Sequence, residues 1–169
     1  LCMRKIMDDR YIVIMAGGKG ERFWPESRLL RPKHLLPIVG DSAMLRQTVD
    51  RIGDTVRSEN IFIVTNVTQQ DSIREMCPEL PAENVVAEPV GRDTAPAVGL
   101  SMLLVKQKNP NGVFILLPAD HVIHDSKGFQ KSLRAGFEVA AQREVLVTIG
   151  IKPTGPATGY GYIQKSDQS

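Results

Sequence analysis

The chain has 169 residues, of which 42% are hydrophobic and 24% charged, and its formal net charge at pH 7 is +2. A chain of this length supports one hydrophobic core, which buries about 68–70% of the surface that the unfolded chain exposes. The small net charge argues against a basic nucleic-acid-binding protein, and no apolar run approaches the roughly 20 residues that cross a bilayer. We therefore expect one domain over residues 1–169, without a nucleic-acid or membrane partner.

The two cysteines, Cys2 and Cys77, lie far apart and match neither a disulfide framework nor a metal-ligand spacing. Unpaired cysteines are typical of reducing compartments, so we predict a cytoplasmic protein. The first ten residues, LCMRKIMDDR, are not followed by an apolar segment of the signal-peptide type. An opening on Leu1 and an end at Ser169, soon after a strand-like segment, are compatible with fragment boundaries at both ends.

Short apolar runs alternate with helical patterns along the chain. Runs rich in valine and isoleucine predict strands that are buried on both faces of a parallel sheet, at residues 11–15, 61–65, 85–87, 113–117 and 145–149. Helical spacing of apolar residues predicts a helix in 41–52, with Asp41 or Ser42 as N-cap, and an amphipathic helix carrying Phe129, Leu133 and Phe137. A further helix over 94–106 is apolar on most faces. The alternation predicts a doubly wound α/β fold with a mostly parallel sheet.

The turn-rich residues 152–164, KPTGPATGYGYIQ, interrupt this alternation and end in a strand-like run. We interpret them as a departure from the regular sheet, either the start of a second lobe or an antiparallel extension. Ligands of open α/β sheets bind outside the carboxyl ends of the strands. The loops that follow Met15, Ala87 and Leu117 are therefore the places where we expect the functional residues.

The loop after the first predicted strand, residues 16–33, reads AGGKGERFWPESRLLRPK. A dinucleotide fingerprint starting at Gly18 requires a third glycine where Phe23 stands, and a Walker A loop requires Lys and Ser or Thr after its last glycine, where Glu21 and Arg22 follow Gly20. Both sites are excluded. What remains is a glycine turn whose backbone N–H groups allow the close approach of an anion.

Two cations follow the glycine turn, Arg22 and, eleven positions later, Lys33. Pro25 and Pro32 restrict the backbone and would hold both cations at fixed places, which favours a polyphosphate ligand over a flexible surface loop. On position alone, the two charges are also compatible with solvated surface residues.

Asp120 follows Pro118 and Ala119 at the carboxyl end of an apolar predicted strand. A carboxylate there suits Mg²⁺, which takes one or two carboxylates and completes its shell with substrate phosphates and water. The same position is equally compatible with a helix N-cap or turn aspartate. His121 and His124 lack further ligand-spaced partners, so we assign neither to a metal.

The glycine loop with its arginine, lysine and prolines resembles the signature of the nucleotide-sugar pyrophosphorylases, or sugar-1-phosphate nucleotidyltransferases. Within that family, AGGKGERFWP, with Trp24 before Pro25, is most similar to the mannose-1-phosphate guanylyltransferases, which make GDP-mannose. Three further motifs, EPVGRDTAPAVGL, LLPADH and PATGYGYIQ, follow in the family's order, so the resemblance covers about residues 11–164. It implies a Rossmann-like nucleotidyltransferase fold.

The resemblance also implies a reaction. The phosphate oxygen of mannose 1-phosphate attacks the α-phosphorus of GTP in line and releases pyrophosphate, with Mg²⁺ as cofactor and without a protein nucleophile. The implied catalytic cations are Arg22, facing the triphosphate, and Lys33, at the reacting phosphate. The other implied site residues are Ala16, Gly17, Gly18, Gly20, Glu88, Arg92 and Thr94 for the nucleotide, Gly161 for the sugar and Asp120 for the metal.

Several of these residues are compatible with more than one role. A carboxylate such as Glu88 accepts hydrogen bonds from the N1–H and the amino group of guanine, which fits the base-reading role of this loop in the family. Asp93 and Thr94 are also good N-cap residues for the following helix. Many relatives have asparagine where Asp93 stands, which puts a base or ribose contact at this position in doubt. Tyr160 and Tyr162 are compatible with either sugar packing or a core role.

Members of the family are about twice this length or more. The resemblance therefore implies further sugar contacts, a second metal-binding aspartate and often a carboxyl-terminal domain for homodimer formation, which we expect beyond Ser169. We expect an amino-terminal nucleotide-binding portion that catalyses poorly on its own. The alternatives are a thymidylyl- or adenylyltransferase for another sugar phosphate, a non-catalytic paralogue and a molybdenum-cofactor nucleotidyltransferase.

Overall fold

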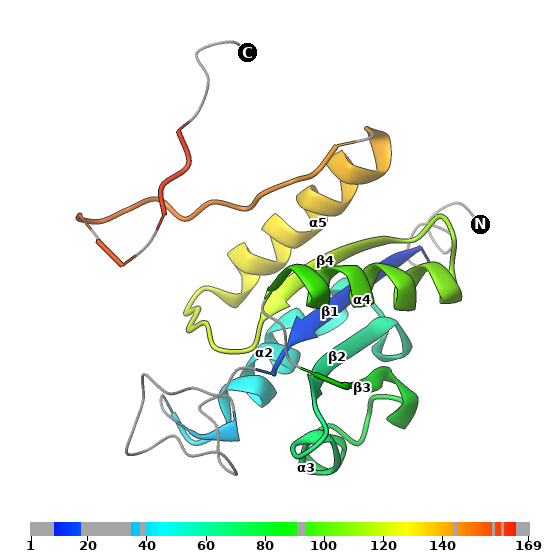
Figure 1. Cartoon of the computed structure of the whole chain (residues 1–169). Coiled ribbons are helices and arrows are strands. Elements are labelled where there is room, and N and C mark those ends of the chain that lie inside the picture. Colours follow the sequence, from blue (N-terminus) through cyan, green and yellow to red (C-terminus); the bar gives the residue numbers. More distant parts are fainter. Residues whose placement is uncertain are drawn as a thin grey trace.

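The computed structural model describes residues 9–17, 35–37, 40–90, 94–143, 145–156, 158–159 and 161–164. Within these residues the chain forms a four-stranded sheet with helices on both faces (Figure 1). The strands are β1 (Arg10–Met15), β2 (Ile61–Asn66), β3 (Val85–Glu88) and β4 (Val113–Pro118). The helices are α2 (Met44–Ile52), α3 (Gln70–Met76), α4 (Thr94–Lys108) and α5 (Ser126–Gln142), and short 3-10 helices cover Gly53–Thr55, Ser58–Asn60 and Ala82–Asn84. The predicted α/β fold is confirmed.

The strand order is β3-β2-β1-β4, and every neighbouring pair is parallel. The chain moves outward from β1 through β2 to β3 and then returns past β1 to β4, so the direction of winding reverses between β1 and β4. Met15 is paired with Val64 and Pro118, and Asn66 is paired with Glu88. The carboxyl ends of all four strands therefore meet at one edge, where an open α/β sheet binds its ligand.

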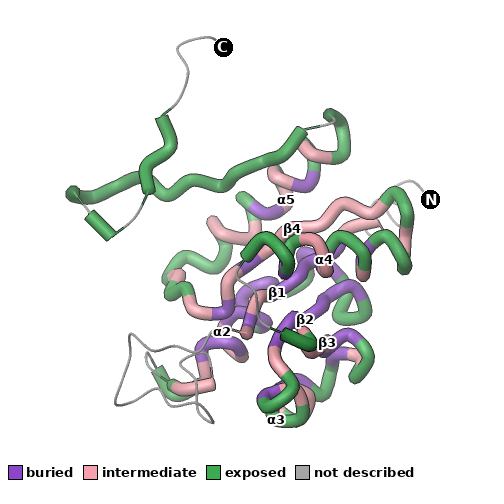
Figure 2. Tube along the Cα trace, viewed as in Figure 1, coloured by how far each residue is buried: buried purple, intermediate pink, exposed green. Residues whose placement is uncertain are grey.

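The core lies on both faces of the two central strands. Alternate side chains of a strand point to opposite faces, so Ile12 and Ile14 join a larger cluster with residues of α2, α3 and α5. Tyr11 and Val13 join a smaller cluster with α4 on the other face. Figure 2 shows the buried residues concentrated in the sheet, as predicted for parallel strands covered on both sides.

The prediction of a strand over residues 145–149 is wrong. These residues form no strand, and their large apolar side chains are 41–102% exposed. A strand is stable only when its backbone groups pair with a neighbour, and no partner for this segment exists in the part of the chain that the structure describes. Ile149 instead leans against α5, where its Cδ1 lies 3.6 Å from the position of a Cβ on Gly136.

Residues 152–156, 158–159 and 161–164 leave the sheet, as expected for this turn-rich segment, and run as an exposed tail away from the body of the protein (Figures 1 and 2). The strand-like end that we predicted does not form there: Tyr162 and Ile163 are 59% and 71% exposed.

The predicted N-cap of α2 is also wrong. The helix begins at Met44 after Ala43, without a side-chain cap. Backbone oxygens bind this end of the helix instead: Met44 N donates to Leu36 O at 3.2 Å, and Gln47 Nε2 donates to Ser42 O at 2.7 Å.

Gly53 ends α2 with φ +56° and ψ −133°, a combination that essentially only glycine adopts. A Cβ at this position would lie 2.6 Å from Nε2 of Gln130, whose amide donates to the Arg51 carbonyl. We expect Gly53→Ala to lower the free energy of unfolding by about 1–3 kcal/mol in urea denaturation. Gly99→Ala is the matched control, because nothing lies within 4 Å of an added Cβ in α4; it should raise that free energy by about 0.5–1 kcal/mol. A similar loss in both variants would contradict the backbone argument.

Candidate functional site

The end of β1 is bound to both neighbouring strands just before the glycine loop. Ala16 N donates to Val64 O at 2.8 Å, and Ala119 N donates to Met15 O at 3.1 Å. Ala16 is only 1% exposed. These bonds fix the place where the glycine loop leaves the sheet, so Ala16 and Gly17, two predicted nucleotide-binding residues, lie at the carboxyl edge between β2 and β4.

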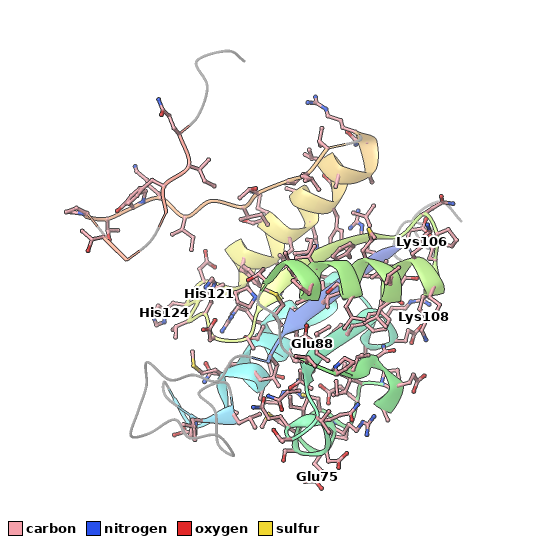
Figure 3. The ribbon with its side chains drawn as sticks, in the orientation of Figure 1. Glu75, Glu88, Lys106, Lys108, His121 and His124 are labelled. Atoms are coloured by element: carbon pink, nitrogen blue, oxygen red, sulfur yellow. The ribbon has the colours of Figure 1, made fainter. Side chains whose placement is uncertain are left out.

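Gly17 lies beside Glu88, although 71 positions separate them in the sequence. Glu88 ends β3, and its Oε2 lies 3.4 Å from the position that a Cβ on Gly17 would take. Because Gly17 has no side chain, it does not itself cover this face of the Glu88 carboxylate. Glu88 is half-buried, and this burial raises its pKa. The structure therefore brings together two residues that the sequence analysis assigned to one ligand. Figure 3 shows Glu88 at the end of β3.

The end of β2 contributes polar residues that the sequence analysis missed. Thr65 is 0% exposed and Gln69 is 3% exposed. Thr65 Oγ1 donates to Ala16 O at 3.1 Å and lies 3.3 Å from Gln69 Oε1. Asn66, next along the edge, accepts a hydrogen bond from the Thr68 hydroxyl at 2.7 Å. The sequence did indicate these residues at the sheet edge, because the polar pair Thr65 and Asn66 ends an apolar run just as Glu88 does.

Asp120 follows β4 at the same edge and is half-buried. It is preceded by Ala119, whose carbonyl lies 3.5 Å from the buried Thr48 hydroxyl of α2. His121 and His124 are exposed on the loop between β4 and α5 (Figure 3). The described residues contain no group of three or more His, Cys, Asp or Glu that would hold a metal ion. A single carboxylate at a phosphate site still fits Mg²⁺, because substrate oxygens and water complete its shell.

The site follows the sheet edge. From β3 to β4 the edge spans three inter-strand spacings of about 4.8 Å, which gives roughly 14 Å. Glu88 stands at one end of this line, Gly17 near the middle and Asp120 at the other end. Such an arrangement suits an elongated ligand, with a hydrogen-bonding group at the β3 end and negative charge at the glycine loop and β4.

The other predicted site residues lie elsewhere or outside the described residues. Thr94 is the exposed first residue of α4. Gly161 lies in the exposed tail, with nothing within 4 Å of an added Cβ, so the structure does not bring it to the sheet edge. The tail contains a hollow of about 330 Å³ lined by Gly155, Pro156, Thr158 and Tyr162, which is not part of this edge. The predicted residues Gly18, Gly20, Arg22, Lys33 and Arg92 lie outside the described residues.

The helices of the described residues include none that is both long enough and apolar enough to cross a membrane.

Asp125 caps α5 by accepting a hydrogen bond from Gly128 N at 2.8 Å, so the second carboxylate of the β4–α5 loop has a structural role.

The chain is similar to known proteins over nearly its whole length. It is 40% identical over 163 residues to a mannose-1-phosphate guanylyltransferase of Escherichia coli strain K12, a match that covers 94% of this chain and 34% of that protein. It is 40% identical over 159 residues to the mannose-1-phosphate guanylyltransferase RfbM of Salmonella typhimurium strain LT2, covering 92% of this chain and 33% of the relative. The chain thus spans about a third of the length of the curated relatives it matches.

A solved structure shares the fold. The crystal structure described as a mannose-1-phosphate geranyltransferase from Thermus thermophilus matches 78% of this chain and 38% of its own chain, with a TM-score of 0.70 and 32% sequence identity. The family model described as nucleotidyl transferase matches residues 11–169, which include every element of the sheet edge from β1 onward. With its parallel sheet and with Gly17 at the end of β1, beside the winding reversal, the chain belongs to the nucleotidyl transferase family.

Proposed function

We propose that this chain binds GTP along the carboxyl edge of its sheet and serves in the transfer of the guanylyl group to mannose 1-phosphate, which yields GDP-mannose and pyrophosphate. The observation that carries the proposal is the placement of Glu88 beside Gly17 at the end of the nucleotidyl transferase sheet. It puts a carboxylate suited to guanine next to a glycine turn suited to phosphates. The names of the relatives that are 40% identical to this chain support the same choice of substrates.

The proposed chemistry requires positioning and charge neutralisation more than covalent catalysis. Both substrates are anions, so they repel each other as they approach. Lys33 and Arg22, in the loop that begins at Gly17, are the cations that we assign to the reacting phosphate and the triphosphate. Mg²⁺, held by Asp120 and by phosphate oxygens, would supply further neutralisation at the β4 end of the edge.

Guanine recognition is assigned to Glu88. In its ionised form this carboxylate has only acceptor oxygens, and guanine presents two adjacent donors, N1–H and the amino group. Adenine and thymine present no such donor pair to a carboxylate. Calorimetric titration of the chain with GTP, ATP and dTTP tests the assignment, and conversion of GTP and mannose 1-phosphate to GDP-mannose tests the reaction. Tighter binding of ATP or dTTP than of GTP would favour a sister nucleotidyltransferase instead.

Glu88→Gln is expected to weaken GTP binding without lowering the stability of the fold. At neutral pH we expect GTP affinity to fall about 10- to 100-fold, the effect of losing hydrogen bonds to a charged acceptor. The unfolding free energy of the empty chain should stay equal or rise, since burial raises the pKa of Glu88 and the ionised form is therefore disfavoured in the folded state. A group with a raised pKa stabilises the fold at low pH, and its contribution is lost as pH rises through that pKa.

The pH dependence of wild-type binding follows from the same shift. GTP affinity should fall on acidification at a higher pH than an ordinary glutamate would cause, because Glu88 becomes protonated earlier. The Glu88→Gln variant should lack this fall. Glu75→Gln is the matched control, since Glu75 is exposed on α3, away from Glu88 (Figure 3). A Glu88→Gln chain that binds GTP as the wild type does would remove Glu88 from the base site.

A further inference from the structure

We propose that Thr65 is a positioning residue of the nucleotide site: its buried hydroxyl holds the Ala16–Gly17 backbone in the place from which Gly17 and Glu88 face one ligand. The inference rests on the proposed function and adds to it a residue on β2, a strand that supplied no predicted site residue. Thr65 does not need to touch the ligand. It acts through the backbone that does.

The geometry connects Thr65 to the loop through a side chain. The amide of Ala16 donates to Val64 O on β2 at 2.8 Å, as the next rung of the parallel ladder. The carbonyl of Ala16 accepts from the Thr65 hydroxyl at 3.1 Å. Both residues are almost completely buried, at 1% and 0% exposed. This burial keeps water away from the hydrogen bond, so the Ala16 carbonyl accepts from the Thr65 hydroxyl in place of water.

Thr65 is itself held in place. Oε1 of Gln69, which is 3% exposed, is a second acceptor 3.3 Å from the Thr65 hydroxyl, so the one hydroxyl proton is shared between this oxygen and the Ala16 carbonyl. The backbone N–H of Gln69 donates to Asn66 O at 3.2 Å in the turn that follows β2. A β-branched side chain has few χ1 rotamers in a strand, so the hydroxyl has little freedom to turn away. The rotamer thereby keeps the hydroxyl within hydrogen-bond distance of the Ala16 carbonyl at the end of β1.

The backbone of the same threonine packs against Gly17. A Cβ on Gly17 would lie 3.8 Å and 3.9 Å from the carbonyl carbon and Cα of Thr65, and 3.4 Å from Glu88 Oε2 on the next side. Gly17 is thus enclosed by the two strands that flank the proposed base site. A small shift of the Ala16–Gly17 peptide changes the spacing between Gly17 and Glu88, on which simultaneous contact with base and phosphates depends.

Thr65→Val tests this arrangement, because valine keeps the shape and β-branching of threonine but has no donor. The buried Ala16 carbonyl then loses the donor that the described residues supply, and we expect it to move toward water, which displaces Gly17. We expect nucleotide affinity to fall about 5- to 50-fold, the range that follows from one buried acceptor left without a donor. Thr65→Ser keeps the hydroxyl and should restore affinity to within about threefold of the wild type.

The matched control is Thr55→Val. Thr55 is also 0% exposed, but its hydroxyl has no hydrogen-bond partner among the described residues, and it lies in the short helix after α2. The same substitution there should leave nucleotide affinity unchanged. If Thr65→Val does not fold, as judged by near-ultraviolet circular dichroism, Thr65→Cys replaces it. A thiol is a weaker donor than a hydroxyl, so Thr65→Cys should bind less tightly than Thr65→Ser.

The experiment is calorimetric titration of wild type and the Thr65 and Thr55 variants with GTP, ATP and dTTP, at one temperature below all unfolding transitions. Selective loss of affinity in Thr65→Val, recovered in Thr65→Ser, supports the inference. Unchanged affinity with lowered stability, or a Thr65→Ser chain as weak as Thr65→Val, overturns it. A wild type that binds ATP or dTTP best refutes only the choice of guanine, and Thr65 is then judged with that nucleotide. A wild type that binds none of the three refutes the proposed function and this inference together.

Discussion

Replacing Lys33 with alanine is expected to lower the rate of nucleotidyl transfer from GTP to mannose 1-phosphate by about 10²- to 10³-fold, as loss of one preorganised electrostatic donor does in other enzymes. The reason is that both substrates of the proposed reaction are negatively charged. Two anions must meet at the α-phosphorus, and an ammonium group held there neutralises charge that water would otherwise have to reorganise to solvate. Pro32 precedes Lys33 and restricts the backbone that carries it.

The loss should appear in turnover more than in KM, since the interaction is strongest where charge develops. The measurement is the initial rate of pyrophosphate release by the complete enzyme at saturating substrates, because this chain is expected to catalyse poorly on its own. Lys33→Arg keeps the charge but changes the geometry and should retain part of the rate. Lys108→Ala is the matched control, because Lys108 is exposed at the far end of α4 (Figure 3). Near-normal turnover of Lys33→Ala would remove this lysine from the reaction centre.

The sheet was predictable because its central strands are determined by their own residues. Residues 11–15 and 61–65 are apolar at almost every position, and only a strand covered on both faces buries such a run. Residues 145–149 have the same composition, yet they form no strand. The difference lies in pairing: a β-strand depends on a neighbour that its own sequence does not encode, and the described residues provide none for this segment.

The candidate site was predictable in part, for a related reason. The rule that ligands bind at the carboxyl ends of parallel strands led to the loops that contain Gly17, Glu88 and Asp120, and the family resemblance then assigned these residues to the site. Thr65 and Gln69 were not predicted because their role depends on the register between β1 and β2. Only the pairing of β1 with β2 puts the Thr65 hydroxyl beside the Ala16 carbonyl.

Other assignments stay predictions. The roles of Arg22, Lys33 and Arg92 rest on sequence spacing and family resemblance, and these residues lie outside the described part of the chain. A sugar contact by Gly161 would require this glycine to approach the sheet edge, because its segment runs as an exposed tail.

In the complete enzyme, Asp120→Asn is expected to lower magnesium-dependent turnover by about 10²- to 10³-fold, because the charge stabilisation that a bound metal supplies amounts to several kcal/mol. Asparagine keeps the size of the side chain and an acceptor oxygen but removes the negative charge that Mg²⁺ prefers among its ligands. Part of the rate should return as the Mg²⁺ concentration is raised, since a weakened site still fills by mass action. GTP affinity in the presence of EDTA should be the same in the variant and the wild type.

The β4–α5 loop supplies its own control, Asp125→Asn. Asp125 caps α5 through Gly128 N, and asparagine caps a helix about as well as aspartate, so this variant should keep both stability and magnesium response. The two substitutions remove the same charge five positions apart. If Asp120 were only a turn residue, both variants would behave alike, and any deficit would appear in urea denaturation and not in the dependence of rate on Mg²⁺. A magnesium response that changes in Asp120→Asn alone would place the metal at the β4 end of the sheet edge.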